Sequence, residues 1–172
     1  LNGERLFCGT FRCKASGNVT NLPGFKEGLW WVQDAAARQV VMLSGNVRGK
    51  RVIDLCAAPG GKTFYLICAG AIVTAVDRSE KRLRFLRENL ERLELSAEII
   101  KADSLNWKPK ELVDIVLIDA PCSATGTLRR HPDIAHLKTT TDVKKLALVQ
   151  SQLLDSAVFM LKPSGVIVFC TC

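Results

Sequence analysis

The feature that most constrains the fold is a short apolar run that changes abruptly into small residues and glycines. It reads Val52-Ile53-Asp54-Leu55-Cys56-Ala57-Ala58-Pro59-Gly60-Gly61-Lys62-Thr63. Such a run predicts a strand that ends in a tight turn, followed by a helix that begins near Gly61. Alanine and glycine let backbone N–H groups approach a ligand closely, and the positive end of the helix would face that ligand. We interpret the turn as a cofactor-binding loop.

Two simpler interpretations of this loop stay open. A Gly-Gly pair between a strand and a helix is often only a turn. The ending Gly61-Lys62-Thr63 also resembles a phosphate-binding P-loop, but that motif requires a glycine five positions before Gly61, where this chain has Cys56. The dinucleotide motif G-x-G-x-x-G is absent from the loop as well.

From Arg51 onward, strand-like runs alternate with helical stretches. Five runs end at Leu55, Val76, Lys101, Ile118 and Phe169. Strands joined by helices in this way predict an α/β fold with a doubly wound, mainly parallel sheet. We expect a core over residues 46–172, preceded by an N-terminal segment and helix over residues 1–45 that cover the sheet.

Capping residues and leucine spacing locate three helices. Asp34 is the expected N-cap of a helix over residues 35–42, which Gly45 closes. A third helix is expected over residues 142–161, before a last strand over residues 166–170. Between them, Ser79 is the expected N-cap of a helix whose leucines fall on one face: Leu83, Leu86, Leu90 and Leu93.

The charge of the chain indicates a polyanionic partner. Its 172 residues include 24 Lys and Arg against 17 Asp and Glu, a formal net charge of +7. This surplus attracts polyanions, and nucleic acid is the natural candidate. Phe25, Trp30 and Trp31 could then stack on bases, although packing in the core is the interpretation that we favour.

The cysteines and the absence of long apolar runs indicate a cytoplasmic protein. Seven cysteines are an odd number, and the sequence has no export signal, so we expect reduced thiols. No apolar run approaches the ~18 residues of a membrane span. The pairs Cys8/Cys13 and Cys170/Cys172 lack the C-x-x-C spacing of a zinc site, so we expect no metal. The sequence does not fix the oligomeric state, and we favour a monomer.

Acidic residues follow three consecutive predicted strands. Asp77, Asp103 and Asp119 stand at the ends of the second, third and fourth strands. Ligands of such sheets bind beyond the carboxyl ends of the strands, and an acidic residue ~20 positions after the glycine loop typically meets ribose hydroxyls. Any one of these aspartates could be an N-cap or a turn residue. Together, beside the small-residue loop, they favour a cofactor that contains a nucleoside.

Two cysteines follow the last two predicted strands. Cys122 lies just past Asp119, and Cys172 lies just past the fifth strand. Most buried cysteines are inert, and that alternative stays open for each thiol. Cysteines in loops above a ligand site can instead be exposed to cations and helix N-termini, which lower the thiol pKa and make the thiol a nucleophile.

Four motifs occur in the order loop 54–63, Asp119-Ala120-Pro121-Cys122-Ser123, Arg129-Arg130-His131-Pro132-Asp133-Ile134 and Thr171-Cys172. In this order they closely resemble the Nol1/Nop2/Sun family of RNA cytosine-5 methyltransferases. The segments Leu22-Pro23-Gly24-Phe25 and His131-Pro132-Asp133 are similar to the branch that acts on bacterial small-subunit ribosomal RNA. The resemblance extends from about Leu22 to Cys172.

The resemblance implies a Rossmann-like, S-adenosylmethionine-dependent enzyme that methylates carbon 5 of a cytosine in RNA, expected to be 16S ribosomal RNA. In that family a thiolate adds to carbon 6 of the base, which makes carbon 5 nucleophilic. By resemblance, Cys172 is the nucleophile and Cys122 assists release of the methylated base. Asp119 would hydrogen-bond the cytosine edge and lie near the cofactor. The target base must leave its stack to reach such a pocket.

The same resemblance assigns the remaining contacts. Asp77 would bind the ribose and Asp103 would meet the adenine. Arg129, Arg130 and His131 would contact RNA phosphates, unless they form a solvated basic loop. The methionine part of the cofactor would lie against seven loop residues: Cys56, Ala57, Ala58, Pro59, Gly60, Gly61 and Lys62.

The chain also departs from the family pattern. Cys170 stands where the family usually has a serine or another small residue, and it adds a third thiol. We expect a catalytic-domain fragment, truncated after the fifth strand, that binds the cofactor but turns over poorly. Two other functions stay open: a non-catalytic RNA-binding module, and a P-loop-like nucleotide hydrolase in which the apolar run before Asp119 would position a magnesium ligand.

Overall fold

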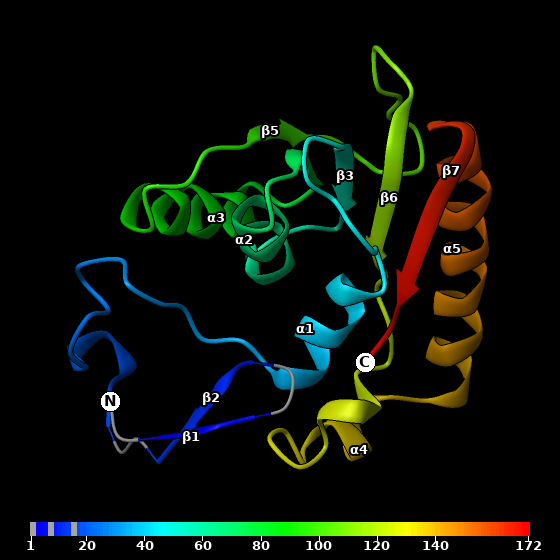
Figure 1. The fold of residues 1–172 in the computed structure, drawn as a ribbon. Helices are drawn as coiled ribbons and strands as arrows, with labels where there is room; N and C mark the ends of the chain where they lie inside the picture. Colours follow the sequence, from blue (N-terminus) through cyan, green and yellow to red (C-terminus); the bar gives the residue numbers. More distant parts are fainter. Residues whose placement is uncertain (1–2, 7–8, 15–16) are drawn as a thin grey trace.

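Five strands form one parallel sheet in the order β5-β4-β3-β6-β7 (Figure 1). The computed structural model describes residues 3–6, 9–14 and 17–172. Each strand ends within one residue of its predicted end. The strands are β3 (Arg51–Leu55), β4 (Ile72–Asp77), β5 (Glu98–Lys101), β6 (Val113–Asp119) and β7 (Leu161–Cys170). The chain runs outward from β3 to β5 and then returns to β6 on the other side of β3, so the doubly wound prediction is confirmed.

Helices cover both faces of this sheet. In Figure 1, α5 lies along one side of the strands, and the first three helices lie on the other. A short α4 (Ile134–Leu137) and two 3-10 turns, η1 (Val19–Asn21) and η2 (Thr125–Thr127), complete the elements that accompany the sheet. The longer helices are α1 (Ala35–Met42), α2 (Gly61–Cys68), α3 (Glu80–Arg92) and α5 (Thr140–Val158).

Successive side chains of each strand point to opposite faces of the sheet, so the core is divided between the helices on one face and those on the other. Ile53 of β3 and Ile118 of β6 pack in the cluster that includes Leu153 of α5. Their neighbours in sequence point to the opposite face, where Val52 packs with Val41 of α1. Because both faces are covered, the strands read as continuous apolar runs.

The predicted start of α3 is confirmed. Oγ of Ser79 accepts a hydrogen bond from the backbone N–H of Arg82 at 3.4 Å, as an N-cap does. Of the four leucines placed on one face, Leu83, Leu86 and Leu90 are buried in the core. Asp34 stands at the N-cap position of α1, but its side chain makes no capping hydrogen bond. That carboxylate pairs with Arg130 instead, at 3.2 Å.

The end of α5 is the main correction to the predicted elements. We predicted a helix to Leu161 and a strand from Val166, whereas β7 already begins at Leu161. Val113 pairs with Leu161 and Ile115 pairs with Val166, so residues 162–165 form a bulge inside the strand. The Pro-Ser-Gly signal therefore marks an irregular strand and not the turn after a helix.

The first part of the chain forms a hairpin apart from the main sheet (Figure 1). Its strands, β1 (Gly3–Arg5) and β2 (Phe11–Cys13), pair in antiparallel fashion. No pattern in the sequence predicted these two strands. The proposed division of the chain at residue 45 stays a prediction. In the described part of the chain, no helix is both long and apolar enough to cross a membrane.

Candidate active site

A cavity of about 370 Å³ opens where the strand order reverses, at the carboxyl ends of the strands. This edge is where doubly wound sheets bind their ligands. Its wall includes residues from the loops after all five strands. Three carboxylates and three thiols predicted from the sequence line it together: Asp77, Asp103, Asp119, Cys56, Cys122 and Cys172.

The loop after β3 is closed so tightly that it requires glycine at position 60. Gly60 has a φ of +112°, and a Cβ atom there would lie 2.3 Å from Cδ1 of Leu86 and 2.4 Å from Cζ of Phe64. The N–H of Ala57 donates to the carbonyl of Val76 at 3.1 Å, which ties the loop to the end of β4. Of the predicted loop residues, Cys56 lines the cavity, Ala57, Ala58 and Gly60 are buried, Gly61 and Lys62 are half-buried, and Pro59 is exposed.

Asp77 is buried beside this loop and already accepts several hydrogen bonds. It is 2% exposed. Its Oδ1 accepts from the N–H of Ser79 at 2.9 Å, and its Oδ2 accepts from the N–H of Ala58 at 3.2 Å. Nη1 of Arg82 lies 3.3 Å from the same Oδ2. The carboxylate is thus held in one orientation at the cavity wall.

Asp103 organises the turn after β5. Its Oδ1 accepts from the N–H of Leu105 at 3.0 Å, and its carbonyl accepts from the N–H groups of Asn106 and Trp107. These local bonds fit the turn role that the sequence left open for each aspartate. Asp103 also lines the cavity, so its turn places a carboxylate on the side where the three acidic residues converge.

Asp119 forms an ion pair with Lys62. Nζ of Lys62 lies 2.7 Å from Oδ2 of Asp119, and the lysine side chain is only 14% exposed. Burial opposes the charged ammonium, but the attraction and hydrogen bond of Asp119 outweigh it, so the pKa of Lys62 is raised. Sequence analysis grouped Lys62 with the cofactor loop and missed this pairing with the end of β6.

Cys122 and Cys172 meet above the ends of β6 and β7. Their Sγ atoms are 3.2 Å apart. The backbone N–H of Cys172 donates to Sγ of Cys122 at 3.3 Å, and that thiol donates to the carbonyl of Cys172 at 3.1 Å. Gly126 keeps this region open, because a Cβ atom there would lie 2.9 Å from the carbonyl carbon of Cys172.

Burial raises the pKa of three thiols around the cavity. It raises the pKa of Cys56 to about 11 and that of Cys170 to about 12. The pKa of Cys172 is raised to about 11, first by burial and then by the adjoining Cys122 thiol. Cys170 donates to the carbonyl of Ile118 and to Oδ1 of Asp119, both at 3.5 Å. Cys170 is therefore engaged at the sheet. None of these three thiols has the lowered pKa that the sequence suggested for cysteines above a ligand site, because burial outweighs the nearby cations.

The predicted RNA contacts Arg129, Arg130 and His131 lie outside the cavity wall. All three are exposed, in the segment between η2 and α4. Arg130 pairs with Asp34, which ties this segment to the start of α1. The structure fits either a phosphate contact or a solvated loop, the two alternatives left open by the sequence.

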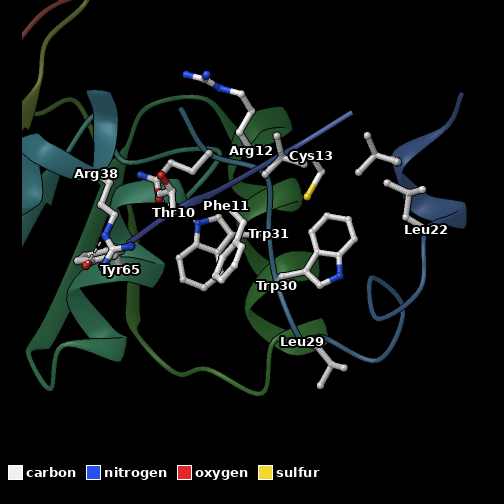
Figure 2. A pocket seen from close by; sticks show the side chains of 13 residues that line it. Thr10, Phe11, Arg12, Cys13, Leu22, Leu29, Trp30, Trp31, Arg38 and Tyr65 are labelled. Carbon is white, nitrogen blue, oxygen red and sulfur yellow. Dashed lines mark hydrogen bonds between the residues drawn. The ribbon is translucent and has the colours of Figure 1, made fainter. Parts of the chain in front are cut away.

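Trp30 and Trp31 line a second cavity, of about 490 Å³. In the view of Figure 2, Trp31 lies between Trp30 and the Arg38–Tyr65 pair. Both tryptophans are half-buried and not in the core centre, so the core-packing prediction is correct only in part. Trp31 packs edge to face on Phe64, with ring centroids 5.8 Å apart, and thereby reaches the core.

Two further features of the site were not predicted from the sequence. Arg82 reaches the loop and Asp77, although its sequence context suggests only a charged helix surface. Asp54 is fully buried, and its Oδ2 accepts from Oγ1 of Thr63 at 2.6 Å. Burial raises the pKa of Asp54 to about 7. An aspartate inside an apolar strand was the available signal for this buried pair.

The described residues contain no group of three or more His, Cys, Asp and Glu side chains arranged to hold a metal. Cys8, which we weighed as a disulfide or metal residue, lies outside the described residues. The cysteines that the structure describes are all free thiols.

Comparison with known proteins identifies relatives of the chain. Residues 41–172 match the family described as 16S rRNA methyltransferase RsmB/F. The chain is 45% identical over 159 residues to ribosomal RNA small subunit methyltransferase B of Serratia proteamaculans, which covers 90% of this chain and 37% of that protein. The chain thus spans well under half the length of the curated relatives it matches.

Solved structures share the fold. The crystal structure of PH0851 superposes with a TM-score of 0.91 at 28% identity, covering 100% of this chain and 40% of that one. The structure of NSun6 from Pyrococcus horikoshii with SFG gives a TM-score of 0.81 at 26% identity, covering 91% of this chain and 41% of that one.

Proposed function

The chain belongs to the 16S rRNA methyltransferase RsmB/F family, and from this we propose that it transfers a methyl group from S-adenosylmethionine to carbon 5 of a cytosine in 16S ribosomal RNA. One observation carries the proposal. Carboxylates suited to a nucleoside, Asp77 and Asp103, share a single cavity with the paired thiols of Cys122 and Cys172. Such a cavity can hold a methyl donor and a covalently attached base side by side.

The residues of the cavity fit the cofactor. Its wall carries three carboxylates, which can accept hydrogen bonds from a ribose diol and an adenine amine and which favour a cationic ligand. When bound, S-adenosylmethionine supplies an electrophilic methyl group. NSun6, a structural relative, was solved with SFG, an analogue of S-adenosylmethionine. Asp77 would hold the ribose, Asp103 would meet the adenine and the buried loop after β3 would lie against the methionine part.

The two thiols divide the covalent chemistry between them. The thiol of Cys172, which is neutral at pH 7, first gives its proton to a base or to water. The resulting thiolate adds to carbon 6 of the cytosine, and the displaced electron pair makes carbon 5 nucleophilic. After carbon 5 has gained the methyl group, it gives its proton to a base or to water. The electron pair of that C–H bond restores the ring double bond, the bond between carbon 6 and Sγ breaks, and Cys172 leaves as a thiolate. Cys122 assists this release, since its Sγ lies 3.2 Å from that of Cys172, beside the bond that must break.

Asp119 and Lys62 position the base. The Asp119 carboxylate can accept a hydrogen bond from the exocyclic amine of a cytosine that has left its stack and entered the cavity. The ammonium of Lys62, 2.7 Å away, holds that carboxylate in place. Outside the cavity, the exposed Arg129, Arg130 and His131 would contact RNA phosphates.

Other assignments explain less of the site. A nucleotide hydrolase would use Lys62 and Asp119, but it would leave Asp77 and the Cys122–Cys172 pair without a role. A module that only binds RNA would need none of the carboxylates at the strand ends. Free thiols at the reaction centre require a reducing compartment, which supports a cytoplasmic enzyme.

A trapping experiment tests the proposal. The chain is incubated with S-adenosylmethionine and an RNA that carries 5-fluorocytidine, because fluorine at carbon 5 cannot leave as a proton and the adduct stalls. We expect a covalent chain–RNA species on a denaturing gel, and none with Cys172→Ser. The proposal is contradicted if the unsubstituted chain neither binds S-adenosylmethionine in a calorimetric titration nor forms the adduct.

A further inference from the structure

Arg82 reaches from α3 to the end of β4 and to the loop after β3. Its Nη1 lies 3.3 Å from Oδ2 of Asp77. Its Nη2 donates to the carbonyl of Ala58. Arg82 also lines the cavity. One side chain thus links three neighbouring parts of the cofactor-binding edge.

Both the backbone N–H and the carbonyl of Ala58 are hydrogen-bonded to side chains. Its N–H donates to Oδ2 of Asp77 at 3.2 Å, and its carbonyl accepts from Arg82. Ala58 is 2% exposed, so water has little access to replace either bond. The loop, Asp77 and Arg82 therefore form a closed ring of interactions. Losing the guanidinium removes the bond to the Ala58 carbonyl and the ion pair with Asp77, and leaves the two held only by the Ala58 and Ser79 N–H groups.

Arg82 also compensates the charge of the buried Asp77 carboxylate. The Asp77 carboxylate is 2% exposed, and burying a carboxylate is costly unless a cation or hydrogen-bond donors compensate it. Arg82 supplies that cation while its own side chain stays half exposed. By contrast, Arg84 on the same helix is 74% exposed and pairs only at the surface, with Glu88.

We propose that Arg82 is a positioning residue for cofactor binding, which it supports by holding Asp77 and the Ala58 peptide in the orientation that the ligand meets. The inference rests on the proposed function, because it assumes that S-adenosylmethionine binds at this edge. Arg82 acts through Asp77 and the loop. Arg82 is not among the residues to which the family resemblance assigns a cofactor contact.

Calorimetric titration with S-adenosylmethionine tests this role. Losing charge-assisted hydrogen bonds predicts that Arg82→Met binds at least about tenfold more weakly, with partial recovery in Arg82→Lys, which keeps the charge. The matched control Arg84→Met should stay within about twofold of the unsubstituted chain, because exposed pairs contribute little. Binding of a short RNA, followed by fluorescence anisotropy, should be the same in all three variants. A general loss of structure would instead weaken the binding of both S-adenosylmethionine and the RNA.

A double-mutant cycle separates the possible results. If Arg82 acts through Asp77, adding Arg82→Met to Asp77→Asn should weaken binding much less than it does in the unsubstituted chain. Full additivity, or equal affinity of Arg82→Met and the unsubstituted chain, overturns the inference and leaves the proposed function intact. No binding by the unsubstituted chain contradicts the proposed function itself. If Arg82→Met fails to fold, Arg82→Lys decides alone: weaker cofactor binding supports the role and unchanged binding overturns it.

Discussion

The Sγ atoms of Cys122 and Cys172 lie 3.2 Å apart, although 50 positions separate the two residues in the chain. The register of the sheet explains their meeting. β6 and β7 pair in parallel with Asp119 opposite Cys170, so the loops after the two strands leave the sheet side by side. Two thiols placed in this way can act on the same base in different steps.

Substitution of each thiol should therefore have a different effect. With S-adenosylmethionine and unmodified target RNA, we expect Cys122→Ala to accumulate a covalent RNA adduct, because release is impaired after the bond has formed. Cys172→Ala should form none. Denaturing electrophoresis measures both, with Cys68→Ala as a control in an exposed thiol of α2. Equal trapping by the two variants would contradict the assigned roles.

The alkylation of Cys172 should depend steeply on pH. Its pKa is raised to about 11, mainly by burial, so the thiol is neutral at pH 7 and the thiolate fraction grows as the pH rises. Iodoacetamide should therefore modify Cys172 about tenfold faster per pH unit between about pH 7 and 10. Peptide mass spectrometry follows the rate at this residue. A plateau below pH 9 would mean that the thiol is already activated in the free chain.

Asp54 should make the chain less stable as the pH rises through about 7. Its pKa is raised from 3.8 to about 7 by burial, so the folded state holds a proton that the unfolded state has lost. The stabilisation is complete below about pH 4 and is lost as the pH passes the folded pKa, by an amount on the order of 4 kcal/mol.

Urea unfolding between pH 5 and 8 measures this effect. In that window Asp54→Asn should show a flatter dependence of the free energy of unfolding on pH, because the substituted residue does not titrate. The carboxylates of Asp114 and Asp142, whose pKa values are lowered by hydrogen bonds, lose their contribution only at lower pH. Identical slopes for the two proteins would rule out Asp54 as the source.

Gly60→Ala should be far more damaging than Gly45→Ala. Both glycines have positive φ, +112° and +68°, but a Cβ atom at Gly60 would collide with Leu86 and Phe64, whereas nothing lies within 4 Å at Gly45. We expect a loss of at least about 3 kcal/mol for Gly60→Ala against about 1 kcal/mol for Gly45→Ala. Denaturant unfolding gives both values, and similar costs would show that the loop can relax.

The main sheet could be predicted because its signals are local. Apolar runs ending in Asp77 or Asp119, and the cap at Ser79, each depend on a few adjacent residues. The strands β1 and β2 carried no such signal, because each has three residues and their side chains are largely exposed. The bulge at residues 162–165 carries turn residues, so the sequence alone cannot distinguish it from a loop.

The contacts within the site could not be predicted, because they depend on how distant segments pack together. The partner of Lys62 could not be known until β3 and β6 were adjacent, and the partner of Arg82 depends on how α3 lies against β4. Asp34 shows the same limit: its sequence context fits an N-cap, but Arg130 comes close enough in space to take the carboxylate. The sequence predicted which residue types lie at the strand ends, but it did not predict which side chains form ion pairs with one another.

The adjacency of β3 and β6 has a consequence for the order in which the protein is made. During synthesis, β3, β4 and β5 and their loops emerge first, so the part of the site assigned to the methyl donor can assemble from neighbouring segments. The part assigned to the base requires β6 to insert beside β3, across more than 50 intervening residues. Such long-range pairing is slow. A nascent chain would therefore acquire its cofactor-binding half before it could react with RNA.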